Sequence, residues 1–484
     1  MRGLGQRRDG LGFKLDRYSR TPFYRQIYER ISHAIIDGTL RQGERLPSVR
    51  SLASQLATSR GTIDLAYGLL SSDGYILTRG AAGTRVVYES PRPSQNRPGP
   101  RRTSPRGASS QPPGEYEPEV IPGVPFALGL PAFDAFPRKL WSRLTIRTAR
   151  ALPLHQLNAP PAGYRPLREA IRSYLAVSRG IACSVDQLFV TSGFQSALGL
   201  ITRALLHAGD QAWIEDPGYF MARLGLEEAG AKTVAVPVDA EGLDVRAGAK
   251  KSPNARFVFV TPSHQMPLGV SLSTSRRAAL LTWAAKAGAW VIEDDYDSEF
   301  RYGSRPLPAL KSLDDAERVL YIGTFSKVLF PGLRLGYLVV PESVADRLFR
   351  ICQLLYRDRP IFDQAIVADF IKEGHFARHI KRMRELYAER RLALAEALAI
   401  VFDGKIKIEL QAGGMHLLAR LADCSNDRDL VARAMAKGLV PAALSTMAVE
   451  HDCGHGLLLS FTNIQRDAAF EVALRLKQAI AAKP

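Results

Sequence analysis

The sequence predicts an α/β protein in two folded parts: a small N-terminal helix-turn-helix module with a wing, and a long domain built on a mainly parallel sheet with helices on both faces. Three observations support this prediction. Apolar residues recur at helical spacing before residue 75, and two short strands follow them. The composition changes abruptly after Tyr88. From residue 121 onward, short apolar runs alternate with helical patterns, which is typical of parallel sheets.

Size and composition limit the class of protein. A chain of 484 residues with 46% hydrophobic residues suits two or three domains with substantial cores. No apolar run approaches the ~20 residues of a membrane span, and no apolar segment follows the basic N-terminus as in a signal peptide. The cysteines are far apart and lack metal or redox spacing, so we expect a reduced, cytoplasmic protein without a metal site: Cys183, Cys352, Cys424 and Cys453.

The positive charge is concentrated near the N-terminus. The net charge is +17, and residues 1–114 hold 19 Lys and Arg against 8 Asp and Glu, a net +11. A basic N-terminal quarter is typical of nucleic-acid binding. On charge alone, a solvated basic surface is an equally good interpretation, so the order of the elements must decide between the two.

The N-terminal module, residues 18–88, contains three predicted helices. The first covers residues 23–35; Ser48 is a good N-cap for the second and Ser59 for the third. Two short helices joined by a tight turn favour a helix-turn-helix, whose second helix would lie in the major groove of DNA. The first turn of that helix would present outward donors for phosphates and base edges, namely Ser59, Arg60 and Thr62.

Two short strands, Tyr75–Leu77 and Thr84–Val87, with a turn over Arg79–Gly83, predict a wing. The module as a whole resembles the winged-helix domain of GntR-type bacterial repressors through the runs Leu46-Pro47-Ser48-Val49-Arg50, Leu52-Ala53, Ser59-Arg60-Gly61-Thr62-Ile63 and Asp73-Gly74-Tyr75. The resemblance implies double-stranded promoter or operator DNA as the partner. It places at or near that DNA the residues Ser48, Arg50, Arg60 and Gly83.

Residues 89–120 are rich in Pro, Arg, Ser and Gly and predict a flexible linker, because such a stretch cannot bury apolar surface. Residues 121–484 form the long α/β domain, with helices such as Ser196–Ala208 and Ser275–Ala287 between its strands. Ligands bind at the carboxyl ends of the strands in such a fold. The predicted strands are Gln187–Thr191, Ala212–Glu215, Thr233–Pro237, Phe257–Thr261, Trp290–Glu293, Val319–Ile322 and Gly336–Val340.

Chemically unusual residues follow several of these strands. The turn Ser192–Gln195 opens a helix and offers an anion site, and Glu293–Asp297 contains an acidic cluster directly after a strand. Lys327 follows another strand, and Arg334 stands seven residues later. Each feature alone has an ordinary interpretation: a common turn, a solvated loop, a surface lysine. Together, a lysine, an anion-binding turn, an arginine and a buried carboxylate are what a pyridoxal 5'-phosphate site requires.

The long domain resembles fold type I aminotransferases, which depend on pyridoxal phosphate, along most of its length. The matching runs are Gly163–Arg168, Thr191–Ala197, Glu215–Tyr219, Thr261–Gly269, Glu293–Phe300 and Thr324–Tyr337. The resemblance implies the same fold and the same cofactor for this domain.

The resemblance also implies a role for individual residues. Lys327 would form the Schiff base with the cofactor, and Asp294 would pair with the ring nitrogen, with Asp295 as the alternative. The residues touching the ring would be Tyr296 at its hydroxyl and Tyr219 or Phe220 at its face. The phosphate would be held by Ser192, Gly193, Phe194, Gln195, Thr324 and Arg334.

Two positions depart from working aminotransferases. Met266 stands where their Asn-Pro-x-Gly run has Asn, so the amide that contacts the ring hydroxyl is missing. Leu458 stands where their Arg-Leu-Ser-Phe run has Arg, which forks onto the substrate carboxylate. Losing that contact costs on the order of 2–4 kcal/mol in a buried site. An α-amino acid is then a poor effector, and a sulfonate, a differently placed carboxylate or pyridoxal phosphate itself fits better, unless another arginine substitutes: Arg223, Arg420 or Arg433.

The whole chain resembles the MocR subfamily of GntR regulators, through the runs Thr261–Gly269 and Glu293–Phe300 together with the fused module. This resemblance implies a head-to-tail homodimer whose aminotransferase-like domain binds pyridoxal phosphate and senses a small amine effector, with little or no turnover. The alternatives are an active aminotransferase with an accessory DNA-binding module, and a protein that has lost the cofactor. The two departures count against the first alternative, and the retained lysine, carboxylate and arginine count against the second.

Overall fold

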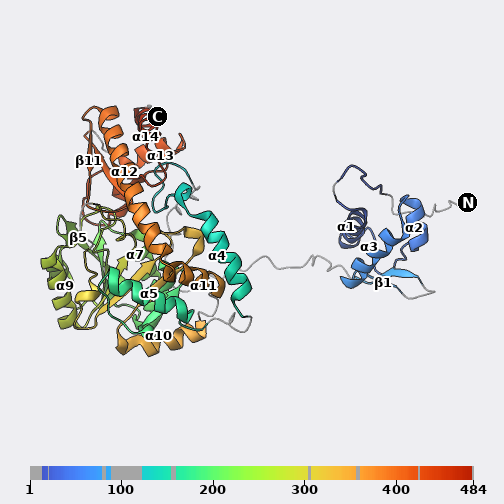
Figure 1. Ribbon diagram of the computed structural model, residues 1–484, viewed down its shortest axis with the longest axis horizontal. Helices are drawn as coiled ribbons and strands as arrows, with labels where there is room; N and C mark the ends of the chain where they lie inside the picture. The colour runs from blue at the N-terminus through green and yellow to red at the C-terminus, as the bar shows by residue number, and fades with distance from the viewer. Residues whose placement is uncertain are drawn as a thin grey trace, which may run out of the picture. The chain divides into compact units, whose positions relative to one another are not determined.

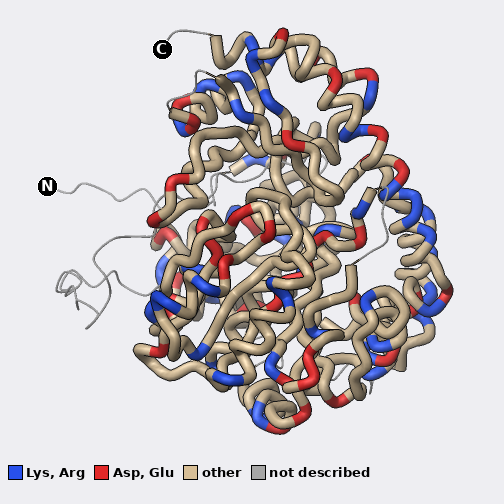
Figure 2. The backbone as a smooth tube through the Cα atoms, turned by 90° about the vertical axis from the view of Figure 1, so that its left-hand side faces the viewer, with Lys and Arg blue, Asp and Glu red and all other residues tan. Residues whose placement is uncertain are grey.

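The computed structural model describes residues 13–19, 21–78, 83–88, 123–153, 160–302, 307–355, 360–422 and 426–481. The chain divides into two compact units, Met1–Gly114 and Glu115–Pro484 (Figure 1). The predicted linker over residues 89–120 and most of the predicted wing turn, residues 79–82, lie outside the described residues. Each unit is therefore described by itself, and Figure 2 shows where Lys and Arg, and Asp and Glu, lie along the backbone.

The N-terminal unit contains three helices and a two-stranded antiparallel sheet among its described residues: α1 (Phe23–Ile36), α2 (Val49–Gln55), α3 (Arg60–Ser72), β1 (Ile76–Thr78) and β2 (Thr84–Val86). Both predicted N-caps are confirmed, since the Ser48 side chain accepts from the amide of Ser51 and the Ser59 side chain from that of Thr62. The helices pack on a core formed by Ile27, Ile31, Leu52, Ile63 and Leu70. The helix-turn-helix and its flanking strands are thus present as predicted.

The large unit is built on an eight-stranded sheet in the order β3-β10-β9-β8-β7-β4-β5-β6. Strands β9, β8, β7, β4 and β5 are parallel neighbours, whereas β10 and β6 run antiparallel to theirs. The mainly parallel sheet was therefore predicted correctly. The strands are β3 (Leu188–Thr191), β4 (Gln211–Asp216), β5 (Lys232–Asp239), β6 (Gly242–Leu243), β7 (Phe257–Val260), β8 (Trp290–Asp295), β9 (Val319–Thr324) and β10 (Gly336–Val339).

Helices cover both faces of this sheet (Figure 1). On one face, α6 (Phe194–Leu205), α7 (Phe220–Glu228) and α10 (Glu342–Leu355) pack against one set of alternating strand residues, among them Phe259 and Ile292. The other face is covered by α5 (Arg165–Ser178), α8 (Val245–Lys251), α9 (Thr274–Ala287) and α11 (Ile361–Lys372). Strands buried on both sides explain their nearly continuous apolar sequences.

The C-terminal part adds a second sheet that the sequence did not predict. It has the order β11-β12-β14-β13 and is entirely antiparallel. Its strands are short and lack a clear period: β11 (Ile406–Glu409), β12 (His416–Leu421), β13 (Ala442–Ala443) and β14 (Leu457–Ser460). Figure 1 shows β11 beside the helices near the C-terminus. The remaining helices are α4 (Arg138–Ala151), α12 (His375–Phe402), α13 (Asp427–Met435) and α14 (Ala469–Ala481).

Several predicted boundaries differ from the structure by one or more residues. Strand β8 continues through Asp294 and Asp295, beyond the predicted end at Glu293, so these two carboxylates belong to the strand and not to a loop after it. Helix α6 begins at Phe194 and ends at Leu205, and not at 196 and 208, because Gly193 already supplies the N-cap. Within the described part of the chain, none of the helices combines the length and the apolar content needed to span a bilayer.

Candidate cofactor site and nucleic-acid interface

Lys327 lies on the loop after β9, half-buried. Its Nζ donates a hydrogen bond to the carbonyl of Gly129, at 3.1 Å. Gly129 has a φ of +71°, and a Cβ on it would overlap Nζ, so the glycine leaves the space that the amine occupies. A segment almost 200 positions earlier in the chain therefore forms one wall around the lysine.

Asp294 is a carboxylate on which the charge of Lys327 acts. It is 6% exposed, and burial raises its pKa well above the usual value for Asp. Asp295 raises the pKa further, whereas the Lys327 ammonium lowers it. A cationic ring nitrogen beside Asp294 would stabilise the ionised carboxylate in the same way.

Asp295, the alternative partner for the ring nitrogen, points to the opposite face of β8. Its Oδ2 lies 2.8 Å from Nε of Arg179 and accepts a hydrogen bond from the hydroxyl of Tyr321. All three side chains are almost fully buried. Because Asp295 is already neutralised by a buried arginine, the geometry favours Asp294 as the residue available to a ligand.

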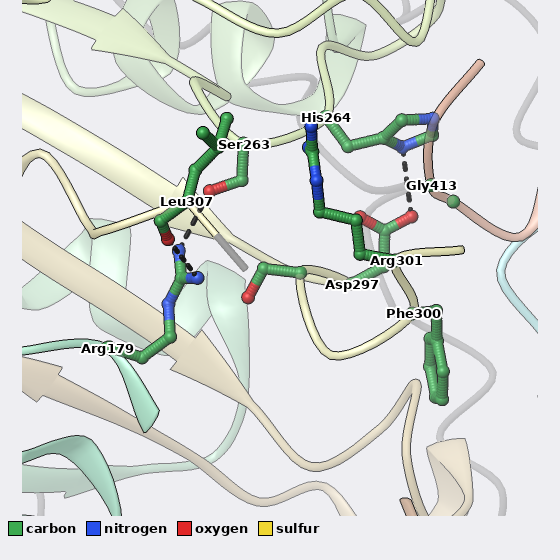
Figure 3. Close-up of a pocket in the computed structure, with 10 residues that line it drawn as sticks. Arg179, Ser263, His264, Asp297, Phe300, Arg301, Leu307 and Gly413 are labelled. Carbon is green, nitrogen blue, oxygen red and sulfur yellow. Dashed lines mark hydrogen bonds and ion pairs between the residues drawn. The ribbon is translucent and has the colours of Figure 1, made fainter. Parts of the chain in front are cut away.

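Tyr296 follows Asp295 and belongs to a buried polar group. Its hydroxyl lies 3.0 Å from Nδ1 of His264, and the same nitrogen lies 3.0 Å from Oδ2 of Asp297. Figure 3 shows His264 and Asp297 facing each other beside Ser263 and Arg301. Burial raises the pKa of Tyr296 well above its usual value, and the surrounding carboxylates raise it further, so this phenol is a neutral donor.

The predicted phosphate turn leads from β3 into α6. Gly193 is the N-cap, with a φ of +97° and no side-chain cap, so the helix begins with a backbone conformation that favours glycine. Gly336 of β10 pairs with Thr191 of β3 on one side and with Thr324 of β9 on the other. This register places the turn Ser192–Gln195 and the end of β9, which carries Thr324 and leads to Lys327, at one edge of the sheet.

Four of the predicted residues around this edge have contacts or conformations that can be described individually. Phe194 makes an edge-to-face contact with Tyr219, at 5.5 Å between ring centroids. The Thr324 hydroxyl accepts from the amide of Ser326. Arg334 is exposed and has a left-handed φ of +47°, a conformation that costs a non-glycine residue about 1 kcal/mol or more.

The N-terminal unit places most of its candidate DNA contacts on the surface. Ser48, Arg50, Ser59 and Arg60 are exposed, and Thr62 is half-buried. The hydroxyls of Ser59 and Thr62 are 2.8 Å apart, so each already has a partner within the protein. Arg60 at the first position of α3 is thus the side chain in this turn most available to DNA.

A basic residue beside the wing was missed by sequence reasoning. Gly83 has a φ of +81°, and a Cβ on it would lie 2.7 Å from Nε of Arg45. The guanidinium of Arg45, which is exposed, therefore passes over this glycine at the base of the wing. The signal was present, since Arg45 directly precedes the Leu46-Pro47-Ser48 run, but only the sheet pairing brings it to Gly83.

Comparison with known proteins identifies both units. Residues 149–440 match the family described as aminotransferase class I and II, and residues 23–86 match bacterial regulatory proteins of the gntR family. The chain is 37% identical over 462 residues to the probable rhizopine catabolism regulatory protein MocR of Rhizobium meliloti, covering 93% of this chain and 92% of the relative. The chain belongs to the MocR subfamily of GntR-type transcription regulators.

Two further similarities support the assignment of this MocR-type regulator. It is 32% identical over 472 residues to the pyridoxine biosynthesis transcriptional regulator PdxR of Corynebacterium glutamicum, covering 97% of this chain and 98% of the relative. Kynurenine aminotransferase of Pyrococcus horikoshii, solved in complex with PMP, matches with a TM-score of 0.67 and 29% identity over 73% of this chain and 90% of the enzyme. The large unit therefore has the fold of an enzyme family that uses pyridoxal phosphate, and this regulator binds that cofactor.

The residues present fit pyridoxal phosphate. Lys327 offers an amine in a space kept open by Gly129. Asp294 offers a buried carboxylate whose pKa is lowered by the charge of that amine. The uncapped start of α6 and the neighbouring hydroxyl of Thr324 suit a phosphate dianion. Lys327 would hold the aldehyde carbon, Asp294 the ring nitrogen, and the turn with Arg334 the phosphate.

The two residues that depart from working aminotransferases, Met266 and Leu458, belong to one apolar cluster. Leu458, which is fully buried, shares an apolar cluster with Met266, although 192 positions separate them. The cluster also contains Leu128, next to Gly129, and Phe220, next to Tyr219. An apolar wall thus stands beside the cofactor site in place of an amide and a guanidinium.

The three candidate replacement arginines of this MocR-type regulator differ in position. Arg223 lines a cavity together with Tyr219 and Phe220, although it also pairs with Glu227. Arg420 binds Glu409 and the carbonyl of Cys453. Arg433 binds Asp429 and the carbonyl of Ile480. Of these three, Arg223 is the one that shares a cavity with a predicted site residue.

Proposed function

We propose that this MocR-type regulator binds promoter DNA through its N-terminal unit and senses a small amine through the site around Lys327. The observation that carries the proposal is the Lys327 amine, held at Gly129 within the field of the Asp294 carboxylate, in one chain with an N-terminal unit of the gntR family. When bound, the cofactor supplies an aldehyde carbon that exchanges one amine for another.

The side chains around the site have separate tasks in this proposal. Asp294 would hold positive charge at the ring nitrogen, and the turn Ser192–Gln195 with Thr324 would hold the phosphate. When an effector amine takes the place of Lys327, the lysine amine would be left beside the Gly129 carbonyl, where its hydrogen bond can hold it. Two arrangements of the chain with different affinities for the effector are the physical requirement for a signal.

The effector that suits this site is an amine without the carboxylate of an α-amino acid, or with an acidic group placed elsewhere. Leu458 lies in an apolar cluster and offers no hydrogen bonds to a carboxylate. If the effector carries an acidic group, Arg223 is the candidate to bind it, because it lines the cavity next to Tyr219.

We further propose that the protein acts in the cytoplasm as a head-to-tail homodimer.

The test combines the cofactor's visible absorbance with DNA binding. The full-length protein should show the visible band, should lose it in Lys327→Ala and should keep it in Lys286→Ala, which removes an exposed lysine on α9. Amines should change the band and, at the same concentrations, the mobility shift of the promoter DNA upstream of the protein's own gene. Rapid multiple-turnover transamination would show that the protein is an active aminotransferase and would refute the proposed sensor function. A visible band that survives in Lys327→Ala would refute the proposed site.

A further inference from the structure

A histidine that the proposed function does not use lies between Tyr296 and Asp297. His264 is 4% exposed, and its Nδ1 lies 3.0 Å from the Tyr296 hydroxyl and 3.0 Å from Asp297 Oδ2. Asp297 itself is 1% exposed. Figure 3 shows the imidazole and the carboxylate directed toward each other.

The buried carboxylate determines which ring nitrogen carries a proton. The Asp297 carboxylate, whose Oδ2 lies 3.0 Å from Nδ1, favours the tautomer that carries hydrogen on Nδ1. That hydrogen is directed to the Tyr296 oxygen, because Asp297 Oδ2 itself accepts no hydrogen bond within the described part of the chain. The Tyr296 oxygen can then only accept from His264, and cannot donate to it. The phenolic hydrogen of Tyr296 must therefore point to another acceptor.

The imidazole is also held in place by its packing. Gly269 and Gly414 both have left-handed φ values, +72° and +93°. A Cβ on Gly269 would lie 2.9 Å from Nε2 of His264, and a Cβ on Gly414 would overlap the ring. Two glycines from distant segments thus leave the space for one imidazole, so its Nδ1 keeps a constant direction.

We propose that His264 is a positioning residue, which directs the Tyr296 hydroxyl so that it donates to the ring oxygen of pyridoxal phosphate. This inference rests on the proposed cofactor site. It explains how the site works without the amide that Met266 has replaced. The missing contact is compensated by a Tyr296 hydroxyl whose hydrogen can point only one way.

The charges around Tyr296 come from several elements. Burial raises the pKa of Tyr296, and Asp297, Asp294, Glu215 and Asp295 raise it further, so the phenol stays protonated across the neutral range. The His416 ring lies 5.3 Å from that of His264, and Arg301 and Arg179 line the same cavity. None of these groups is altered in the experiment below, so their contributions stay constant.

Two variants at position 264 separate positioning from packing. An asparagine amide occupies the position of the imidazole Nδ1, whereas a glutamine amide occupies that of Nε2. His264→Asn therefore keeps a donor toward Tyr296, and His264→Gln removes it. Both variants are polar and differ by a single methylene, so each is the matched control for the other.

The readout is the pH titration of the visible absorbance of the full-length, cofactor-loaded protein. Donation from Tyr296 lowers the basicity of the ring oxygen, so its loss should move the transition upward by about one pH unit. We expect this shift in Tyr296→Phe and in His264→Gln, and a titration close to the original protein in His264→Asn. The double variant His264→Gln/Tyr296→Phe should shift no further than Tyr296→Phe alone.

The outcomes distinguish this inference from the proposed function. A protein without a visible band dependent on Lys327 would overturn the proposed site and the inference with it. A normal band with the same titration in His264→Gln as in the original protein would overturn only the role of His264, as would full additivity with Tyr296→Phe. If His264→Gln does not fold, His264→Asn still tests the proposal. A pH titration of His264→Asn like that of Tyr296→Phe would contradict it.

Discussion

Asp294 and Asp295 are adjacent in sequence and alike in chemistry, yet they meet different surroundings. Asp295 is paired with Arg179 and Tyr321 on one face of β8, and Asp294 lies within the field of Lys327 on the other. The alternation of side chains along a strand produces this difference. One carboxylate therefore supports the fold, and the other is the candidate to bind the cofactor.

Replacing each carboxylate by its amide should separate these roles. Asp295→Asn should lower the free energy of unfolding of the large unit by about 3 kcal/mol, because it leaves the buried Arg179 without its counter-charge. Asp294→Asn should instead weaken cofactor binding at least tenfold with little loss of stability, because its pKa is already raised by burial. Calorimetry of the apo protein and titration with pyridoxal phosphate measure the two effects, and the reverse pattern would contradict the assignment.

The second prediction for a single side chain is that Leu458 selects effector amines without a carboxylate. With the original protein, tyramine should change the cofactor's absorbance at lower concentration than tyrosine, because the two molecules differ only in the carboxylate that Leu458 cannot bind. Leu458→Arg should reverse this order by restoring the guanidinium. Leu458→Met, which keeps an apolar side chain of similar volume, is the control and should preserve the preference for tyramine. Equal responses in all three proteins would show that position 458 does not select the effector.

Two elements of the N-terminal unit, the start of α3 and the wing, offer different kinds of contact to DNA. Arg60 stands at the first position of α3, and Ser59 caps that helix. Arg45 lies over Gly83 at the base of the wing. A recognition helix approaches base edges, whereas a wing arginine is suited to phosphate.

Replacing each of the two arginines by alanine should therefore change DNA binding in a different way. Arg60→Ala should cost about 1–3 kcal/mol on the operator and reduce the preference over unrelated DNA. Arg45→Ala should weaken binding to both sequences alike and reduce the slope of affinity against salt by about one. Fluorescence anisotropy at several salt concentrations measures both, and Arg30→Ala, an exposed arginine on α1, is the control that should change neither.

The whole molecule joins a gntR-family unit to a unit with the aminotransferase fold in one chain. In the proposed function, thermodynamic linkage constrains how the two units influence each other. If an effector amine changes operator affinity by a given factor, the operator must change effector affinity by the same factor. We expect this factor to lie between about 5 and 150, the usual range for coupled sites.

Reciprocity can be checked by titrating the amine while following the cofactor's absorbance, with and without saturating operator DNA. The shift in apparent effector affinity should equal the shift in DNA affinity measured in the opposite experiment. In Arg60→Ala, at DNA concentrations that no longer saturate the protein, the shift should disappear. A DNA response to the amine without the reciprocal effect would mean that the amine acts elsewhere than at the proposed site.

The amino-acid sequence by itself indicated the elements of the N-terminal unit, the mainly parallel sheet and the residues of the candidate site. Capping serines, apolar periodicity and the turn Ser192–Gln195 act over a few residues, so the N-caps at Ser48 and Ser59 and the strand before Lys327 could be read directly. Family resemblance then supplied the cofactor. The roles it gave to individual residues stay predictions, and the antiparallel sheet of the C-terminal part was missed because its strands are short.

Only the tertiary structure decided which residues meet. The pairing of Asp295 with Arg179, the contact of His264 with Tyr296, and the shared cluster of Met266 and Leu458 join positions between 32 and 192 residues apart. Such contacts depend on strand order and side-chain direction, which no local pattern specifies. Sequence alone therefore indicated a cofactor lysine with Asp294 as the favoured partner carboxylate. The fold added that Asp295 pairs with Arg179, that His264 contacts Tyr296, and that Met266 and Leu458 share one apolar cluster.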